Sequence, residues 1–267
     1  MTDGQIGGTA FETAGDGPPA VLVHGLGMAR PMWDWQWEAL TRRFRVVRYD
    51  LLGHGDSAKP KGPYSLALFT EQLEALLDGL DIAACGLVGF SLGGMIVRAF
   101  ALAHPERVSA LAILNSAHDR TDAERAAVLL RVEQAARLGP RVTVEAALER
   151  WFTEDYAARH PDVLARVQRW ILANDPEVYP AIYRVLAEGD AELAQAIAAI
   201  RCPTLVLTGG EDHGNSPDMA RRMAALIPGA RAEIIPGLKH MGLAEDPAAF
   251  NSFLVPFLEE AFIAEGG

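Results

Sequence analysis

Residues 89–93 read Gly-Phe-Ser-Leu-Gly, between an apolar pair at 87–88 and a second apolar run that begins at Met95 with helical periodicity. A serine flanked by glycines at a strand-to-helix junction is typical of a tight turn that presents the hydroxyl above a sheet. The N–H of Leu92, at the expected helix N-terminus, would point toward an oxyanion formed on a carbonyl that Ser91 attacks. The stretch predicts a nucleophile at Ser91 and an oxyanion donor at Leu92.

A second glycine-rich loop follows a predicted strand at 20–23. Residues 24–27 read His-Gly-Leu-Gly, and the backbone N–H of Leu26 can supply another donor to the oxyanion. His24 precedes the serine in the chain, and its place in this loop indicates a structural side chain that hydrogen-bonds to backbone. We therefore predict an oxyanion hole formed by Leu26 and Leu92.

A carboxylate and a histidine follow two later strand patterns. The predicted strand at 203–208 ends shortly before Asp212, and the predicted strand at 231–235 precedes a loop that contains His240. The order Ser91, Asp212, His240 is the nucleophile–acid–base order of one hydrolase fold and differs from two protease orders. An imidazole takes the proton of the serine, and a carboxylate fixes the tautomer of that imidazole. These three residues are the predicted catalytic triad.

The loop at 49–57 holds another group of polar side chains, Asp50, His54 and Asp56. They resemble a metal cluster, but no further ligand follows at the spacing of a metal site. Hydrogen bonds that fix the loop are the preferred interpretation. We expect neither a metal nor an organic cofactor.

The bulk properties favour a globular enzyme. The chain has 267 residues, half of them hydrophobic, and α/β folds of this size often form one core. Its net charge of −11 disfavours nucleic-acid binding. Residues 1–20 lack the pattern of a secretory signal, and no apolar run has the length of a membrane span. We expect a cytoplasmic protein in which Cys85 and Cys202 act as small buried hydrophobic residues rather than form a disulfide. A small-molecule substrate is expected, and a homodimer is left open.

Strand-length apolar runs alternate with helical patterns, which predicts a mostly parallel sheet covered by helices on both faces. Further strands are expected at 45–49, 85–89 and 108–114, and helices at 66–78, 92–103, 216–227 and 247–262. Residues 118–199 show only helical periodicity, interrupted at 139–140, 160–161, 175–176 and 189–190. This span predicts a helical cap inserted after the sixth strand, with residues 1–117 and 200–267 as the core.

With these motifs in place, the chain resembles the α/β-hydrolase superfamily over residues 8–262, and within it the 3-oxoadipate enol-lactonase and carboxylesterase group. The resemblance is carried by segments of the loops and of the cap, at 24–27, 32–34, 48–55, 91–96, 150–153, 160–162 and 174–179. It implies the α/β-hydrolase fold, the triad and cofactor-free hydrolysis.

Departures from the family pattern affect several predictions. The segment before Val21 is short and rich in glycine, so we expect the usual first strands to be abbreviated or irregular. Arg98 and the loop at 212–217 are atypical of the lactonase itself and suggest a relative with another substrate. Met241 follows the histidine where hydrolases of carbon–carbon bonds in aromatic ring-fission products usually carry tryptophan, which disfavours that sister family.

The triad has neighbouring rivals. Glu211 is an alternative acid beside Asp212, and His213 is an alternative base on a different loop. Asn115 stands where some relatives place the acid. Since an amide cannot act as a carboxylate, this position favours Asp212.

The cap should govern the substrate. Trp33, Phe90, Trp151 and Met241 are the predicted substrate-binding residues, although aromatic residues of the cap can equally form its own core. All ten basic residues of the cap are arginine, a residue suited to carboxylates. The chain has 21 arginines and 3 lysines, however, and the cap has 14 acidic residues, so surface pairing is the preferred interpretation.

These observations predict a serine hydrolase that acts on a small carboxylic ester or lactone, including an enol-lactone, through an acyl-serine. One alternative is a different reaction on the same triad, either hydrolysis of a carbon–carbon bond or cofactor-free perhydrolysis. Another is a binding protein with the hydrolase fold and little turnover, which an intact triad disfavours.

Overall fold

The computed structural model describes residues 2–265, and its centre is an eight-stranded sheet in the order β1-β2-β4-β3-β5-β6-β7-β8. Strands β3 to β8 run parallel, whereas β2 pairs antiparallel with both β1 and β4. The mostly parallel sheet is thus confirmed. The strands are β1 (Thr2–Ile6), β2 (Thr9–Ala14), β3 (Pro19–Val23), β4 (Arg45–Tyr49), β5 (Cys85–Phe90), β6 (Val108–Leu114), β7 (Thr204–Gly209) and β8 (Arg231–Ile235).

The expectation that the first strands are abbreviated or irregular is wrong. β1 and β2 form a regular hairpin with paired residues from Thr2↔Thr13 to Ile6↔Thr9. Gly7 and Gly8 form its turn with φ angles of +54° and +83°. A two-residue hairpin turn of type I′ requires positive φ at both positions, so these glycines shape the hairpin rather than disrupt it.

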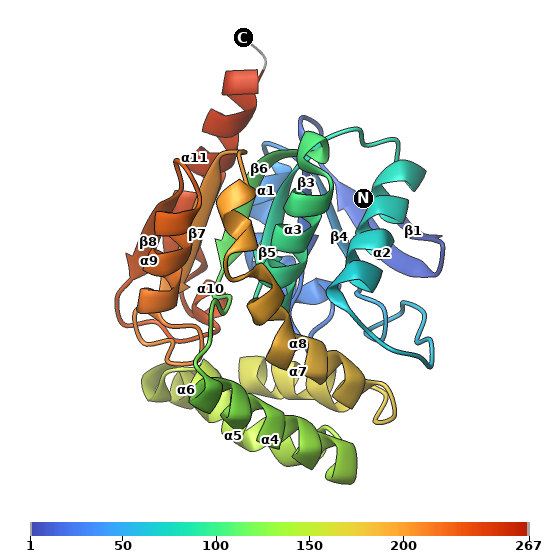
Figure 1. The fold of residues 1–267 in the computed structure, drawn as a ribbon, viewed down its shortest axis with the longest axis vertical. Helices are drawn as coiled ribbons and strands as arrows, with labels where there is room; N and C mark the ends of the chain where they lie inside the picture. Colours follow the sequence, from blue (N-terminus) through green and yellow to red (C-terminus); the bar gives the residue numbers. More distant parts are fainter. Residues whose placement is uncertain (1, 266–267) are drawn as a thin grey trace.

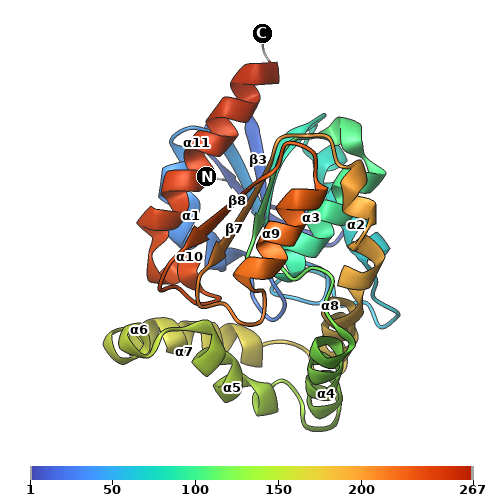
Figure 2. The ribbon, with the colours of Figure 1, turned by 60° about the vertical axis from the view of Figure 1, so that its left-hand side comes forward.

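Helices cover both faces of the sheet (Figure 2). One layer contains α2 (Leu66–Gly79), α3 (Leu92–Ala103) and α9 (Pro217–Leu226), and the other contains α1 (Asp34–Thr41), α10 (Gly242–Glu245) and α11 (Pro247–Glu265). Each layer buries its own apolar cluster against the sheet. The strands in the middle of the sheet, β3 to β7, are accordingly buried over almost their whole length, as expected for a parallel sheet covered on both faces.

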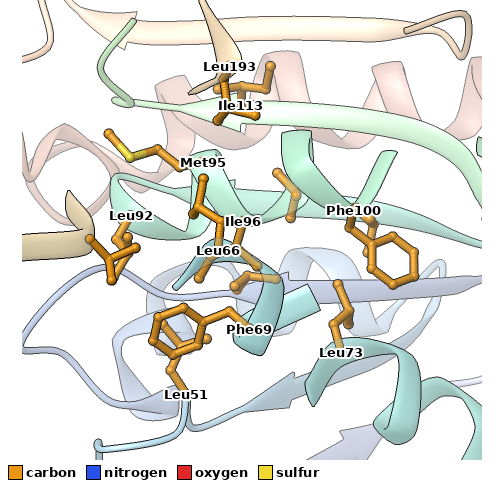
Figure 3. Close-up of a cluster of buried hydrophobic side chains, with 14 of the residues drawn as sticks. Leu51, Leu66, Phe69, Leu73, Leu92, Met95, Ile96, Phe100, Ile113 and Leu193 are labelled. Atoms are coloured by element: carbon orange, nitrogen blue, oxygen red, sulfur yellow. The ribbon is translucent and has the colours of Figure 1, made fainter. Parts of the chain in front are cut away.

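The cluster beneath α2 and α3 supports the nucleophile turn from below. Leu92, Met95 and Ile96 of α3 are fully buried against the sheet and against Phe69 of α2 (Figure 3). Deleting a buried side chain of this size costs about 2–5 kcal/mol. The start of α3 is thus fixed by packing that extends far from Ser91.

A helical insert, α4–α8, follows β6 and lies across one end of the sheet (Figure 1). Its helices are α4 (Asp122–Leu138), α5 (Arg141–Trp151), α6 (Glu154–Arg159), α7 (Pro161–Leu172) and α8 (Tyr179–Leu193). The predicted insertion of helices after this strand is confirmed.

The expected interruption at 189–190 is wrong, because both residues lie inside α8. Gly189 faces Leu66, whose Cδ1 would lie 3.1 Å from an added Cβ, so its small size serves close packing of α8 on the core. Asp190 is fully buried and accepts a hydrogen bond from the backbone N–H of Arg120 at 2.7 Å. Tertiary contacts here outweigh the weak helix propensity of both residues. Within residues 2–265, no helix combines the length and the apolar character needed to cross a membrane.

Candidate active site

Ser91 occupies a sharp turn between β5 and α3. Its backbone has φ +55° and ψ −112°, a conformation rare for a residue with a side chain, and its N–H donates to the Leu114 carbonyl at 2.9 Å. The close passage of strand and helix explains the glycine at 93, where an added Cβ would lie 2.1 Å from the carbonyl oxygen of Val23. The turn predicted from residues 89–93 is therefore present, with Ser91 at its apex.

Asp212 and His240 lie on loops that follow β7 and β8. The Nδ1 of His240 lies 2.7 Å from Oδ2 of Asp212, and both side chains are almost completely buried. Ser91, Asp212 and His240 line one cavity of about 280 Å³. The structure thus brings together the three residues predicted as nucleophile, acid and base.

Several contacts keep Asp212 ionised. Burial acts to raise the pKa of its carboxyl, but His240, the Asn115 amide and the backbone N–H of Asn215 outweigh that effect and hold the pKa below its ordinary value. The Asn215 N–H donates to Oδ1 at 3.0 Å, and the Gly214 N–H donates to the same oxygen at 3.1 Å. A carboxylate held in this way can fix the tautomer of the imidazole and stabilise its charged form.

The rival acid and base occupy different positions. Glu211 is exposed, and its backbone N–H donates to the Leu238 carbonyl at 2.9 Å. His213 is an exposed residue of the cavity wall, whereas His240 is the histidine whose ring reaches Asp212. The geometry favours the pair Asp212 and His240.

Asn115 is a positioning residue whose role the sequence did not reveal. Its Nδ2 donates to Oδ2 of Asp212 at 2.9 Å and to Oγ1 of Thr208 at 3.2 Å. Its φ of +44° lies in the left-handed region that asparagine tolerates better than most residues. Some relatives place the acid at this position, at the end of β6, which is why the sequence drew attention to Asn115. Its contact with the carboxylate of Asp212, on the loop after β7, becomes visible only in the folded structure.

Arg98 supports the nucleophile turn from within α3. This fully buried guanidinium donates to Oγ of Ser116 at 3.1 Å, and that hydroxyl donates to the Ser91 carbonyl at 2.7 Å. Burial lowers the pKa of Arg98 to about 9, which leaves it charged at neutral pH. The residue that departs from the family pattern is thus linked to the serine through one hydroxyl.

The two predicted oxyanion donors border the cavity differently. Leu26 lines the cavity, and Leu92 is the first residue of α3, where the N–H has no acceptor within the helix. The loop that carries Leu26 is fixed at its neighbour, since the Gly27 N–H donates to Nε2 of His54 at 3.0 Å. The N–H of Leu92, at the start of α3, follows Ser91 directly, so an oxyanion hole formed by Leu26 and Leu92 stays a prediction.

The polar residues of the neighbouring loops hold the backbone. Nε2 of His24 accepts from the Leu51 N–H at 3.0 Å, the structural role predicted for it. Asp50 accepts from the N–H groups of Arg30 at 2.6 Å and Asp56 at 3.0 Å. These contacts match the predicted loop-fixing role of this polar group.

The four predicted substrate-binding residues separate into two pairs. Phe90 and Trp151 line the cavity, and their rings lie 4.8 Å and 5.6 Å from the ring of His240. Trp33 and Met241 are fully buried in the apolar cluster under α1 and α11 and lie outside the cavity wall. Hydrophobic packing explains both, and they are not retained as substrate contacts. Side chains of the wall that the sequence did not single out include Met28, Val128, Arg131, Arg150, Ile171 and Leu186.

The helical insert is hydrogen-bonded to the loop that carries His240. The Met241 N–H donates to the Trp151 carbonyl at 2.9 Å, and the Lys239 ammonium donates to the Glu149 carbonyl at 3.0 Å. The end of α5 is therefore attached on both sides of His240.

Comparison with known proteins agrees with this geometry. A family model described as the alpha/beta hydrolase fold matches residues 18–247. (E)-2-((N-methylformamido)methylene)succinate hydrolase of Acinetobacter baylyi is 31% identical over 92% of this chain and 92% of its own, and 3-oxoadipate enol-lactonase 2 of the same organism is 27% identical over 88% and 86%. The crystal structure of an enol-lactonase from Burkholderia xenovorans superposes with a TM-score of 0.88, at 32% identity over 97% of this chain and 100% of that one. With its fold, its site geometry and these relatives in agreement, the chain belongs to the α/β-hydrolase family.

Proposed function

We propose that the protein is a serine hydrolase that cleaves a small carboxylic ester or lactone through an acyl-serine. The observation that carries the proposal is the 2.7 Å contact between His240 and Asp212 in the cavity that also contains Ser91. A strained serine, a buried imidazole and an ionised carboxylate are the groups that nucleophilic acyl transfer requires.

In the acylation step, Ser91 Oγ bonds to the carbonyl carbon and its proton passes to Nε2 of His240. The negative charge develops on the carbonyl oxygen beside the N–H groups of Leu26 and Leu92. When the bond to the leaving oxygen breaks, the histidine returns the proton to that oxygen, which gives an alcohol, or a tethered hydroxyl or enol for a lactone. Water then attacks the acyl-serine by the same route, and the acid is released.

Relatives named as enol-lactonases support a lactone among the candidate substrates. The cavity volume of about 280 Å³ favours a small molecule. We further propose that residues 118–199 act as a lid, because α5 and α8 supply cavity residues such as Trp151 and Tyr183. A closed lid would exclude water and strengthen the electrostatic interactions at the serine.

The proposal is tested with a fluorophosphonate probe and with short p-nitrophenyl esters and lactones. Ser91→Ala should abolish labelling and lower kcat by about 10⁴- to 10⁶-fold, because the nucleophile acts as a unit with its base. Ser252→Ala, an exposed serine of α11, is the matched control and should retain wild-type labelling and rate. Labelling of Ser91→Ala, or a tenth of the wild-type rate, would overturn the covalent mechanism.

A further inference from the structure

The wall of the catalytic cavity is richer in basic groups than the chain as a whole. The chain carries a net charge of −11, yet the wall contains four basic side chains, Arg120, Arg131, Arg150 and Lys239, beside the acidic Glu149 and Asp212. A basic cavity in an acidic protein indicates a ligand with negative charge, since field lines concentrate in such clefts.

Two of these charged groups have partners within the protein. Arg120 donates to the fully buried Asp190 at 3.1 Å, and Asp212 is paired with His240. The ammonium of Lys239 donates to a backbone carbonyl, that of Glu149. Arg131, Arg150 and Lys239 therefore keep charges that no carboxylate neutralises, and of these the ammonium of Lys239 is fixed to a backbone carbonyl. Glu149 is the remaining acidic residue of the wall.

Arg131 is held in place by a neutral group. Its Nε donates to the hydroxyl of Tyr183 at 3.2 Å, and Tyr183 is a buried residue of α8 that also lines the cavity. Because this bond uses only Nε, the two terminal amino groups of the guanidinium remain as donors. A guanidinium fixed at one edge is well suited to bind a planar anion with the rest of its fork.

Arg150, near the end of α5, lines the same cavity as Arg131 of α4 and is partly open to solvent. Partial desolvation lowers the pKa of Arg150, and the positive charge of Arg131 lowers it further, so the two guanidinium groups repel each other. Within residues 2–265, neither group forms an ion pair with a carboxylate, whereas Arg125, Arg159, Arg166 and Arg184 of the same insert do. The exposed Arg137, Arg141 and Arg169 also form no ion pair, but they lie outside the cavity wall, whereas Arg131 and Arg150 line it.

We infer that the substrate carries a carboxylate remote from its scissile carbonyl, and that Arg131 and Arg150 bind this group. The inference rests on the proposed function and adds the chemical class of the substrate. The cavity volume of about 280 Å³ favours half-esters of small dicarboxylic acids and lactones with a carboxylate side chain. An anion placed between the two guanidinium groups would also relieve their repulsion.

The kinetic test compares two substrates that differ in this one charge, mono-p-nitrophenyl adipate and its methyl ester. The wild type should prefer the acid by about 10- to 100-fold in kcat/KM, the scale of a hydrogen-bonded charge pair. Arg131→Gln and Arg150→Gln should each reduce this preference about tenfold or more, mainly through KM. Arg137→Gln, an exposed arginine of α4 outside the wall, is the matched control and should keep the wild-type ratio. A preference for the methyl ester, or an equal loss for both substrates, would overturn the inference.

A binding test separates this inference from the proposed reaction. Adipate should bind the Ser91→Ala protein in calorimetry, and Arg131→Gln in that background should weaken binding about tenfold or more. Hexanoate, with one carboxylate, and inorganic phosphate are the comparison ligands. Binding of adipate without any ester turnover would leave the anion site in place and refute the proposed hydrolysis. Turnover of the neutral ester without adipate binding, or binding of phosphate in its place, would refute the carboxylate site alone.

Discussion

Asn115 donates a hydrogen bond to the same carboxylate oxygen, Oδ2 of Asp212, that lies against His240. The donor and the imidazole approach that oxygen at 2.9 Å and 2.7 Å. An amide at the end of β6 therefore fixes the carboxylate that follows β7. Residues at the ends of two adjacent strands thus hold the carboxylate that contacts His240, the proposed base.

Replacing Asn115 should weaken catalysis and shift its pH dependence. The Asn115 amide stabilises the ionised carboxylate, so its loss raises the pKa of Asp212 and moves the acid limb of the kcat/KM profile to higher pH. Asn115→Gly keeps the backbone freedom that φ +44° needs, and we expect kcat to fall by about 10- to 100-fold. Asn115→Asp should shift the limb further, since it places a like charge beside Asp212. An unchanged limb in both variants would show that Asn115 serves only the strand end.

The strain at Ser91 should appear as a difference between two inactive variants. Its positive φ is unfavourable for any residue with a Cβ, and such conformations cost about 1–3 kcal/mol. Ser91→Gly should therefore have a free energy of unfolding about 1 kcal/mol higher than Ser91→Ala in urea titrations. At Ser109, the buried second residue of β6, the order should reverse, because glycine weakens a strand by about 0.5–1 kcal/mol relative to alanine. Equal stability of the Ser91 pair would mean that the turn relaxes once the hydroxyl is removed.

The free energy of unfolding should decrease as the pH is lowered, and His54 should account for part of this decrease. Burial, with a smaller effect from His24, lowers the pKa of His54 to about 3 from its usual 6.5. Between these values the unfolded chain binds more protons than the folded one. The contribution of His54 is therefore complete above pH 6.5 and is lost progressively as the pH falls toward 3.

Urea titrations from pH 6.5 to 4.5 measure this dependence. This pH range lies above the one in which Asp50 and Asp212 take up protons in the folded protein, because the pKa values of both carboxyl groups lie below the ordinary 3.8. His54→Gln keeps an acceptor for the Gly27 N–H but cannot titrate, so its free energy of unfolding should change less across this range. The same slope in both proteins would assign the pH dependence to other groups, of which His24 is the nearest candidate.

The fold, and the residues that meet in the candidate site, could be predicted because their signals are local. The turn at 89–93 and the apolar runs of the strands each depend on neighbouring residues, and the structure has them at the expected positions. Gly7 with Gly8, and Gly189, were misread because a glycine marks either a turn, an irregular segment or a close contact, and only the packing partner decides which.

The cavity wall needed three-dimensional information. Trp33 and Trp151 are both aromatic residues near expected loops, yet one is buried under α1 and the other lies against His240. Likewise, Arg131 and Arg125 lie on the same helix, but only Arg125 meets the buried Asp190. Helix packing, which long-range contacts determine, divides such residues between core, surface and site.

Specificity should depend on Trp151 more than on a nearby tryptophan of the insert. Trp151 lines the cavity beside His240, whereas Trp170 stacks edge-on against Trp35 outside the wall, at 6.2 Å between ring centroids. Trp151→Ala enlarges the apolar part of the cavity, so larger acyl groups should gain relative to smaller ones. One methylene in such a pocket is worth about 1–3 kcal/mol, which sets the expected shift in relative kcat/KM at about 10- to 200-fold.

The measurement is kcat/KM for p-nitrophenyl esters from acetate to octanoate in both variants. Trp170→Ala should lower stability through lost packing and leave the ranking of substrates as in the wild type. The Met241 N–H bonds to the backbone of Trp151, so the truncation spares that attachment of the histidine loop, and a general loss of rate is not expected. If Trp151→Ala lowers kcat/KM by the same factor for every substrate, the ring supports His240 rather than selecting substrates. Selection must then arise from the loops around Leu26 and Phe90.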